Sequence, residues 1–155
     1  MGTQQILLIV LSVIIVGAAI AVGIQMFNNQ AYSANKSAIA ADAQSFASQI
    51  VQYYKTPESQ GGAGGKVTTG MQTAIGEFIG WGADQTSNDS GKYIIGAVTA
   101  DPPTVTIYGL GTEVKGENRP AVRTIVKLAD GTISAKVIDT AQTTATGLTD
   151  SDFSD

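Results

Sequence analysis

The side chains with the chemistry and spacing to bind a metal ion are Asp84, Asn88 and Asp89, which lie close together in a polar stretch. Calcium takes six or more oxygen ligands from proteins, often from such stretches. The spacing does not match an EF-hand loop, and a solvated turn is the simpler interpretation. We therefore predict no metal site and keep these three residues as weak candidates only.

Two asparagines, Asn35 and Asn88, begin triplets that match the N-glycosylation pattern Asn-X-Ser/Thr. Such triplets occur often by chance. Asn88 belongs to the same polar stretch, where a loop is expected, and it is the better of the two candidate glycosylation sites.

Catalytic chemistry is hard to build from this sequence, because its 155 residues include no histidine and no cysteine. Histidine is the commonest general base and metal ligand, and cysteine supplies thiolates and disulfides. No pair of carboxylates forms an evident acid–base couple. The net charge of −4, with nine basic residues scattered singly, argues against a nucleic-acid partner. The sequence thus predicts neither an enzyme nor a bound cofactor.

The N-terminal segment is uncharged, and the first charged residue is Lys36. Residues 6–24 are apolar except for Ser12, Gly17 and Gly23. At ~1.5 Å per residue this segment is roughly 28 Å long, close to the ~30 Å thickness of bilayer hydrocarbon. It is expected to span a membrane or to lie inside a protein assembly. A cleaved signal peptide fits poorly, since no basic region precedes the apolar run.

The helical pattern continues beyond this segment, because residues 25–54 contain neither proline nor glycine. Apolar residues recur there on one helical face, at Tyr32, Ile39, Ala43, Phe46, Ile50 and Tyr53. Polar residues that include Asn35, Lys36 and Asp42 are expected on the other faces. The pattern predicts one helix from about residue 3 to about residue 54, apolar all round at first and amphipathic later.

Strand patterns dominate the rest of the chain. We expect a glycine-rich loop, a short helix within residues 70–81, a polar loop at 85–91, strands at 92–99 and 104–108, and a hairpin within 121–139. In the hairpin, Asp130-Gly131 is typical of a two-residue turn, which would place Leu128 opposite Ile133 and Val126 opposite Ala135. Its other face would expose Arg123, Lys127, Ser134 and Lys136. The tail from Thr140 is expected to be extended or partly disordered.

These patterns predict an α+β fold in which a long N-terminal helix packs on a small antiparallel sheet. Residues 1–24 would form a membrane-spanning or filament-core helix, and residues 25–55 its amphipathic continuation. Residues 56–155 would form a globular head with a loop, the sheet and a polar C-terminal tail.

This arrangement resembles the type IV pilins and the related pseudopilins of secretion systems. The run Gln4-Gln5-Ile6-Leu7-Leu8-Ile9-Val10-Leu11 resembles the start of a mature pilin. The resemblance implies a precursor processed and methylated at its N-terminus by a prepilin peptidase, held in the inner membrane by a single pass, and polymerised by pilus assembly machinery. The filament core would be formed by Ile6, Leu7, Ile9, Val10, Val13, Ile14, Val16, Ile20 and Ile24.

Two features modify what the resemblance implies. In that family a glutamate near the start neutralises the N-terminal amine of a neighbouring subunit, but Gln5 stands at that place and supplies no charge. Gln4 and Gln5 together would solvate the amine. The family helix often melts locally in filaments, for which Gly17 and Gly23 are the candidates; close helix–helix contact at these glycines is the alternative. We also expect a short basic leader before Met1 in the encoded precursor.

The expected function is that of a structural subunit of an extracellular type IV pilus-like filament, a polymer of this chain at the cell surface. A pseudopilin or minor pilin of a secretion or uptake system is the first alternative. A monomeric membrane-anchored binding module is the second. The amphipathic continuation of the helix disfavours the second alternative, since an anchor does not need it.

Overall fold

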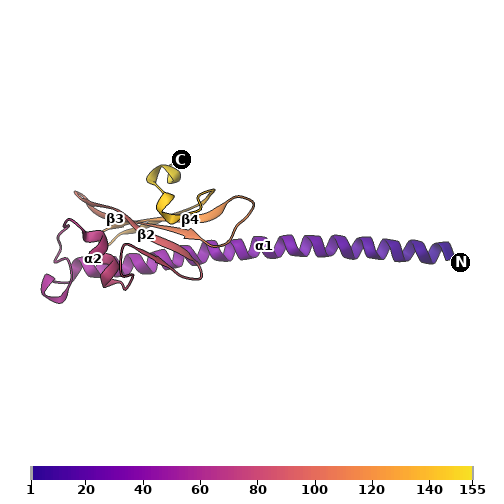
Figure 1. The fold of residues 1–155 in the computed structure, drawn as a ribbon, viewed down its shortest axis with the longest axis horizontal. Coiled ribbons are helices and arrows are strands. Elements are labelled where there is room, and N and C mark those ends of the chain that lie inside the picture. Colours follow the sequence, from indigo (N-terminus) through magenta and orange to yellow (C-terminus); the bar gives the residue numbers. More distant parts are fainter. Residues whose placement is uncertain (1, 155) are drawn as a thin grey trace.

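The computed structural model, which describes residues 2–154, has one helix that extends far beyond the rest of the molecule (Figure 1). This helix, α1 (Gly2–Lys55), has 54 residues and is therefore ~81 Å long. Its C-terminal half carries the head, while its N-terminal half projects alone. The predicted continuous helix is confirmed.

The head is a five-stranded antiparallel sheet with the strand order β1-β2-β3-β4-β5. The predicted α+β class is therefore confirmed, and so is the short helix before the sheet. The elements after α1 are η1 (Glu58–Gln60), α2 (Met71–Phe78), β1 (Gln85–Ser87), β2 (Gly91–Ala100), β3 (Pro103–Gly111), β4 (Arg119–Lys127), β5 (Ile133–Thr140), η2 (Ala145–Gly147) and η3 (Asp150–Phe153). Residues 85–87, which were predicted as loop, form the edge strand β1.

The inner face of the sheet, defined as the face toward α1, forms the main core with one side of the helix. Ile39 and Ile50 of α1 are fully buried, as are Ile107 and Val126 of the sheet. Burying one such side chain stabilises a fold by about 1.5–3 kcal/mol. The helix is therefore held to the sheet along its whole C-terminal half.

The glycine-rich turn after α1 is tied to the end of the helix. The backbone N–H groups of Ala63, Gly64 and Gly65 donate to the carbonyl oxygens of Tyr53, Thr56 and Tyr54, at 3.0, 2.9 and 2.8 Å. The last carbonyl groups of a helix lack partners within the helix. The turn satisfies them and so forms a defined C-terminal cap.

The β4–β5 hairpin has a different register from the predicted one. Val126 pairs with Ile133 and Thr124 with Ala135, because the turn contains four residues, 128–131, and not two. Gly131 closes it with a φ of 73°, and its N–H donates to the carbonyl oxygen of Lys127. The shift is an even number of residues, so each side chain keeps its predicted face.

The outer face of the sheet is covered by the C-terminal tail, contrary to prediction. Ala145, Leu148 and Phe153 of the tail are buried against Tyr108 and Leu110 of β3. The tail predicted to be extended or disordered forms η2 and η3 instead. The apolar residues were overlooked there because they are separated by Thr, Ser and Asp.

Two basic side chains predicted to be exposed are partly buried under this tail. The Arg123 guanidinium lies 5.3 Å from the Phe153 ring centroid and 3.2 Å from an Asp150 carboxylate oxygen. Lys136 donates to the Phe153 carbonyl oxygen at 2.9 Å. Ser134 and Lys127 are exposed, as predicted.

We expect Phe153→Ala to lower the free energy of unfolding of the head by about 3–5 kcal/mol, since this ring is 1% exposed and its loss leaves a cavity. Trp81 is the only tryptophan, and its ring centroid lies 4.9 Å from that of Phe46 in the core. Its fluorescence during urea unfolding of the full chain in detergent measures the change. The exposed Ser154→Ala variant serves as the control. Equal urea midpoints for Phe153→Ala and the native chain would contradict the packing of the tail.

Candidate assembly interface

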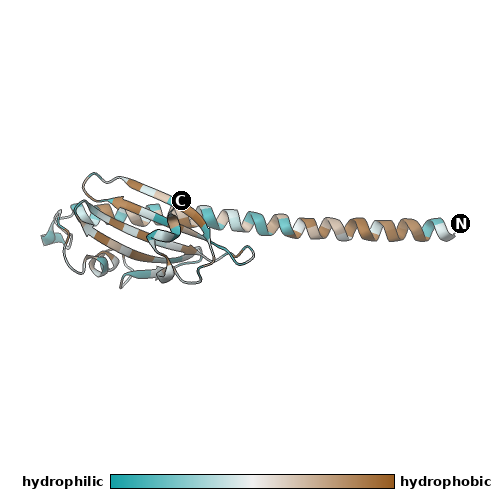
Figure 2. Cartoon of the chain, turned by 90° about the horizontal axis from the view of Figure 1, so that it is seen from above, coloured by the Kyte–Doolittle hydropathy of each residue, from teal (hydrophilic) through white to brown (hydrophobic). Residues whose placement is uncertain are grey.

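The projecting half of α1 is mainly hydrophobic along its length (Figure 2). All of its large apolar residues from Ile6 to Ile24 are at least 50% exposed. The residues predicted to form a filament core all belong to this surface. By length and composition, α1 could cross a membrane. Such a surface is stable only when lipid or protein covers it.

Between Gln5 and Gln25 the only polar side chain on this half is that of Ser12. The Ser12 hydroxyl donates to the Ile9 carbonyl oxygen at 2.8 Å. Gly17 and Gly23 lie within the unbroken helix, and no neighbouring side chain lies within 4 Å of the place where a Cβ would be. Both positions are therefore open to close approach by another helix.

The first turn of α1 carries no acidic residue. Gln4 and Gln5 are exposed there. Their side-chain oxygens can accept hydrogen bonds, whereas a carboxylate would add charge. From residue 2 to residue 5, the polar side chains of the helix are thus all neutral.

Where α1 enters the head, a polar cluster joins it to β5. The Tyr32 hydroxyl and the Lys36 ammonium both donate to one Asp139 carboxylate oxygen, at 2.9 and 2.8 Å. Lys36, first among several causes, holds the pKa of the Asp139 carboxyl below its usual value. Burial and the hydrogen bond to Asp139 raise the pKa of Tyr32 to about 12.

Asn35 lies on the buried face of α1, although it was predicted on another face. Its amide donates to the Ser90 carbonyl oxygen at 2.7 Å, and its side-chain oxygen accepts from the Glu113 N–H at 3.3 Å. Gly111 leaves room for the amide, since a Cβ there would collide with it. Asn35 is only 8% exposed, so the fold hides this candidate glycosylation site.

A second polar contact forms one heptad further along the helix. One Asp42 carboxylate oxygen accepts from the Tyr93 hydroxyl and from the Asn88 amide, both at 2.8 Å. The Asn88 side-chain oxygen accepts from the N–H groups of Ser90 and Gly91, each at 3.0 Å. Asn88 thus fixes the β1–β2 turn to α1, while the residue itself remains exposed.

Sequence reasoning missed Asn35 and Asp42 as contact residues because both are polar. Their spacing was a usable signal, since residues 32, 35, 39 and 42 alternate steps of three and four. Such steps keep residues on one face of a helix. Tyr32 and Ile39 are seven residues apart, which is about two helical turns. The residue one turn after Tyr32 on the same face is Asn35.

The weak metal candidates do not converge. Asp84 precedes β1, whereas Asn88 and Asp89 follow it. The intervening strand separates Asp84 from Asn88 by roughly 13 Å at ~3.3 Å per residue. Within residues 2–154, no group of three His, Cys, Asp or Glu side chains could hold a metal ion.

The fold and this interface define an α+β protein with a projecting apolar helix. Comparisons with protein-family models, with curated proteins and with solved structures found no match to this chain. Its function is therefore argued from its own residues.

Alkaline pH is expected to loosen the junction between α1 and the head. Because the Tyr32 pKa is raised above the value near 10 of an unfolded chain, its stabilising effect is complete below pH 10. It is lost as pH rises from 10 to about 12. We expect Tyr32→Phe to unfold with a shallower pH dependence in this window, by Trp81 fluorescence in detergent. Between pH 7 and 9 the difference between the two proteins should stay constant. Identical slopes above pH 10 would contradict this role of Tyr32.

Proposed function

We propose that this chain is a structural subunit of an extracellular type IV pilus-like filament, polymerised through the projecting half of α1. One observation carries the proposal: α1 runs without interruption from the core of the head into a half whose large apolar side chains are all at least half exposed. A filament core made of the same half from many copies would cover this surface.

The energetics favour both a membrane and a filament as surroundings of this half. Each Ile, Leu or Val that leaves water gains about 1.5–3 kcal/mol. Lipid chains and packed apolar helices offer similar surroundings, so transfer between them changes this gain little. The subunit can therefore rest in the inner membrane as a single-pass protein before it enters a polymer.

The connection between the projecting half and the head favours a filament over a simple anchor. Residues 25–31 are helical and contain neither glycine nor proline, and Tyr32 is already buried against the head. The helix thus enters the head without a flexible linker. A membrane anchor has no need of such a rigid connection, whereas a regular polymer needs every head at one position relative to its helix.

The same proposal includes N-terminal processing and methylation by a prepilin peptidase, as the resemblance to pilins implies. Gln4 and Gln5 would hydrogen-bond the N-terminal amine of a neighbouring copy, in place of an ion pair. Gly17 and Gly23 would be the positions at which α1 loosens when it packs in the filament.

We expect Ile9→Lys to abolish filament formation in expressing cells, because a packed helical core offers an ammonium group no partner. Residue 9 lies near one end of the apolar half, so its ammonium can still reach the membrane surface by extending along the helix. Insertion into the membrane should therefore persist. Electron microscopy of the sheared cell-surface fraction, together with quantitation of the chain in membranes, measures both effects.

Two variants serve as controls in this experiment. Ile9→Leu keeps the apolar core, and Ser59→Lys adds the same charge at an exposed head position; both should assemble normally. Normal filaments from Ile9→Lys would refute the proposed core. If the native chain stays in membranes and forms no filaments, the anchored module is correct. Filaments in which this chain is a trace component would identify a minor pilin or pseudopilin.

A further inference from the structure

The β5 edge of the sheet carries unpartnered backbone groups. The Lys127 N–H donates to the Thr132 carbonyl oxygen, and pairs alternate between bonded and non-bonded along an antiparallel ladder. The next β5 residues whose backbone groups face away from β4 are therefore Ile133, Ala135, Val137 and Asp139. Pro120, which has no N–H, fits this pattern, since it pairs with Asp139. Within residues 2–154, no hydrogen bond reaches these outward groups.

The opposite edge, β1, is also open. The Ile95 N–H donates to the Asp84 carbonyl oxygen, and the Asn88 N–H to that of Gly91. By the same alternation, the backbone groups of Gln85 and Ser87 face away from β2. In the described part of the chain these groups have no hydrogen-bond partner either.

The two edges carry opposite charge. The charged side chains near β5 that do not contact the tail include four lysines and two aspartates, which sum to +2: Lys36, Lys55, Lys115, Lys127, Asp130 and Asp139. Around β1 lie three aspartates and one lysine, for a net charge of −2: Asp42, Asp84, Asp89 and Lys92. Complementary charge steers two surfaces together and disfavours contact between like surfaces.

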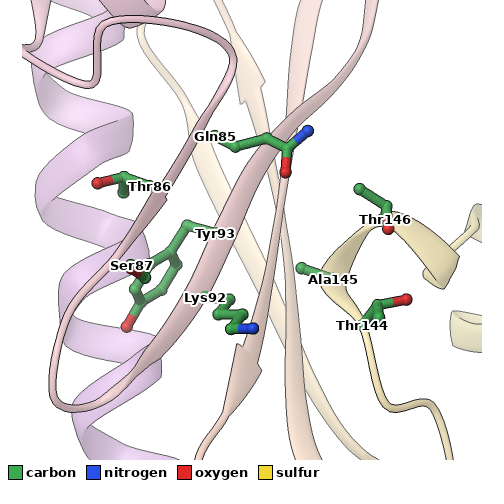
Figure 3. A pocket seen from close by; sticks show the side chains of 8 residues that line it. All are labelled: Gln85, Thr86, Ser87, Lys92, Tyr93, Thr144, Ala145 and Thr146. Carbon is green, nitrogen blue, oxygen red and sulfur yellow. The ribbon is translucent and has the colours of Figure 1, made fainter.

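A hollow lies beside β1 on the outer side of the sheet (Figure 3). It has a volume of about 370 Å³ and is lined by β1, by Lys92 and Tyr93 of β2, and by residues 144–146 of the tail. Its lining includes hydroxyl and amide groups, such as those of Gln85 and Thr146 (Figure 3). The β1 edge can therefore receive a polar side chain as well as a strand.

We propose that the β5 edge of one head docks on the β1 edge of a second copy of this chain, so that the heads form a ring of contacts around the filament. This inference rests on the proposed function, because it places both heads on one polymer. β1 and β5 run in the same direction, since each strand of the sheet is antiparallel to its neighbour. Two copies with parallel α1 helices thus bring these edges together as parallel strands.

The contact joins two different surfaces, and it can therefore be repeated from copy to copy. A contact of this kind builds rings or open helices, whereas a contact between identical surfaces closes a dimer. A β5–β5 contact would also require the α1 helices of the two copies to be antiparallel. The opposite charges of β5 and β1 select the repeating contact.

The backbone part of the proposal is tested by Ala135→Pro in the full chain. The Ala135 N–H faces away from β4, so proline removes a donor that the folded head does not use, and edge strands tolerate proline at such positions. We expect filaments of Ala135→Pro to dissociate in detergent about tenfold faster than native filaments. Ala135→Thr keeps the N–H and is the matched control. Equal dissociation of native and Ala135→Pro filaments would overturn strand pairing at this edge.

The charge part is tested by charge reversal, which also decides the matter if Ala135→Pro fails to fold. Lys127 ends β4 beside the β4–β5 turn, Asp89 lies in the β1–β2 turn, and both are exposed. Lys127→Glu and Asp89→Lys should each lower filament yield at low salt about tenfold. The double variant Lys127→Glu/Asp89→Lys keeps the native net charge of the chain but leaves no net charge at either edge, so its yield should stay low.

A single variant away from both edges separates complementarity from net charge. Lys66→Glu changes the net charge by the same amount as Lys127→Glu, but Lys66 pairs with Glu58 in the turn after α1, away from both edges. Its yield should stay close to that of the native chain. If Lys66→Glu lowers the yield as much as Lys127→Glu, or if the double variant recovers the native yield, the docking of β5 on β1 is wrong. Absence of filaments from the native chain would instead refute the proposed function itself.

Discussion

The axial position of the head along α1 depends on two polar side chains, Asn35 and Asp42, on an otherwise apolar helix face. Apolar contacts alone discriminate weakly between positions that differ by one helical turn, ~5.4 Å along the axis. Asn35 and Asp42 each find their partners at one axial position only. A slip by one turn would leave both without these partners, at a cost of about 1–3 kcal/mol for the buried Asn35 amide alone. These two residues therefore fix how far the apolar half projects.

The sheet has apolar residues on both faces, and a different segment of the chain packs against each face. α1 covers the inner face, and the tail covers the outer face through Phe153 and its neighbours. Asp150 holds the tail in place, because it accepts from the Tyr108 hydroxyl at 2.8 Å and pairs with Arg123. Tyrosine–aspartate hydrogen bonds thus occur at both covers, with Tyr32 and Tyr93 on the inner side.

Much of this architecture could be predicted from the sequence, because it follows from periodicity. The bounds of α1, the short helix α2 and the β4–β5 hairpin all reflect repeating apolar residues. The hairpin register was missed because Asp130-Gly131 closes a four-residue turn, a choice that depends on how the turn packs near Val51 of α1. The tail was missed because its apolar residues follow no period, and only the shape of the outer face determines where they bind.

The chemistry of the projecting half limits what it can specify. Between Gln5 and Gln25 its only polar side chain, Ser12, is satisfied within the helix. Packed copies of such a helix could slide past one another with little change in energy, since no polar group marks one axial position. A regular polymer needs a fixed offset, and the charged and hydrogen-bonding groups that can supply it lie on the head. In the filament that we propose, the apolar helices therefore supply the driving force, while the edges of the sheet determine the position of each copy relative to the next.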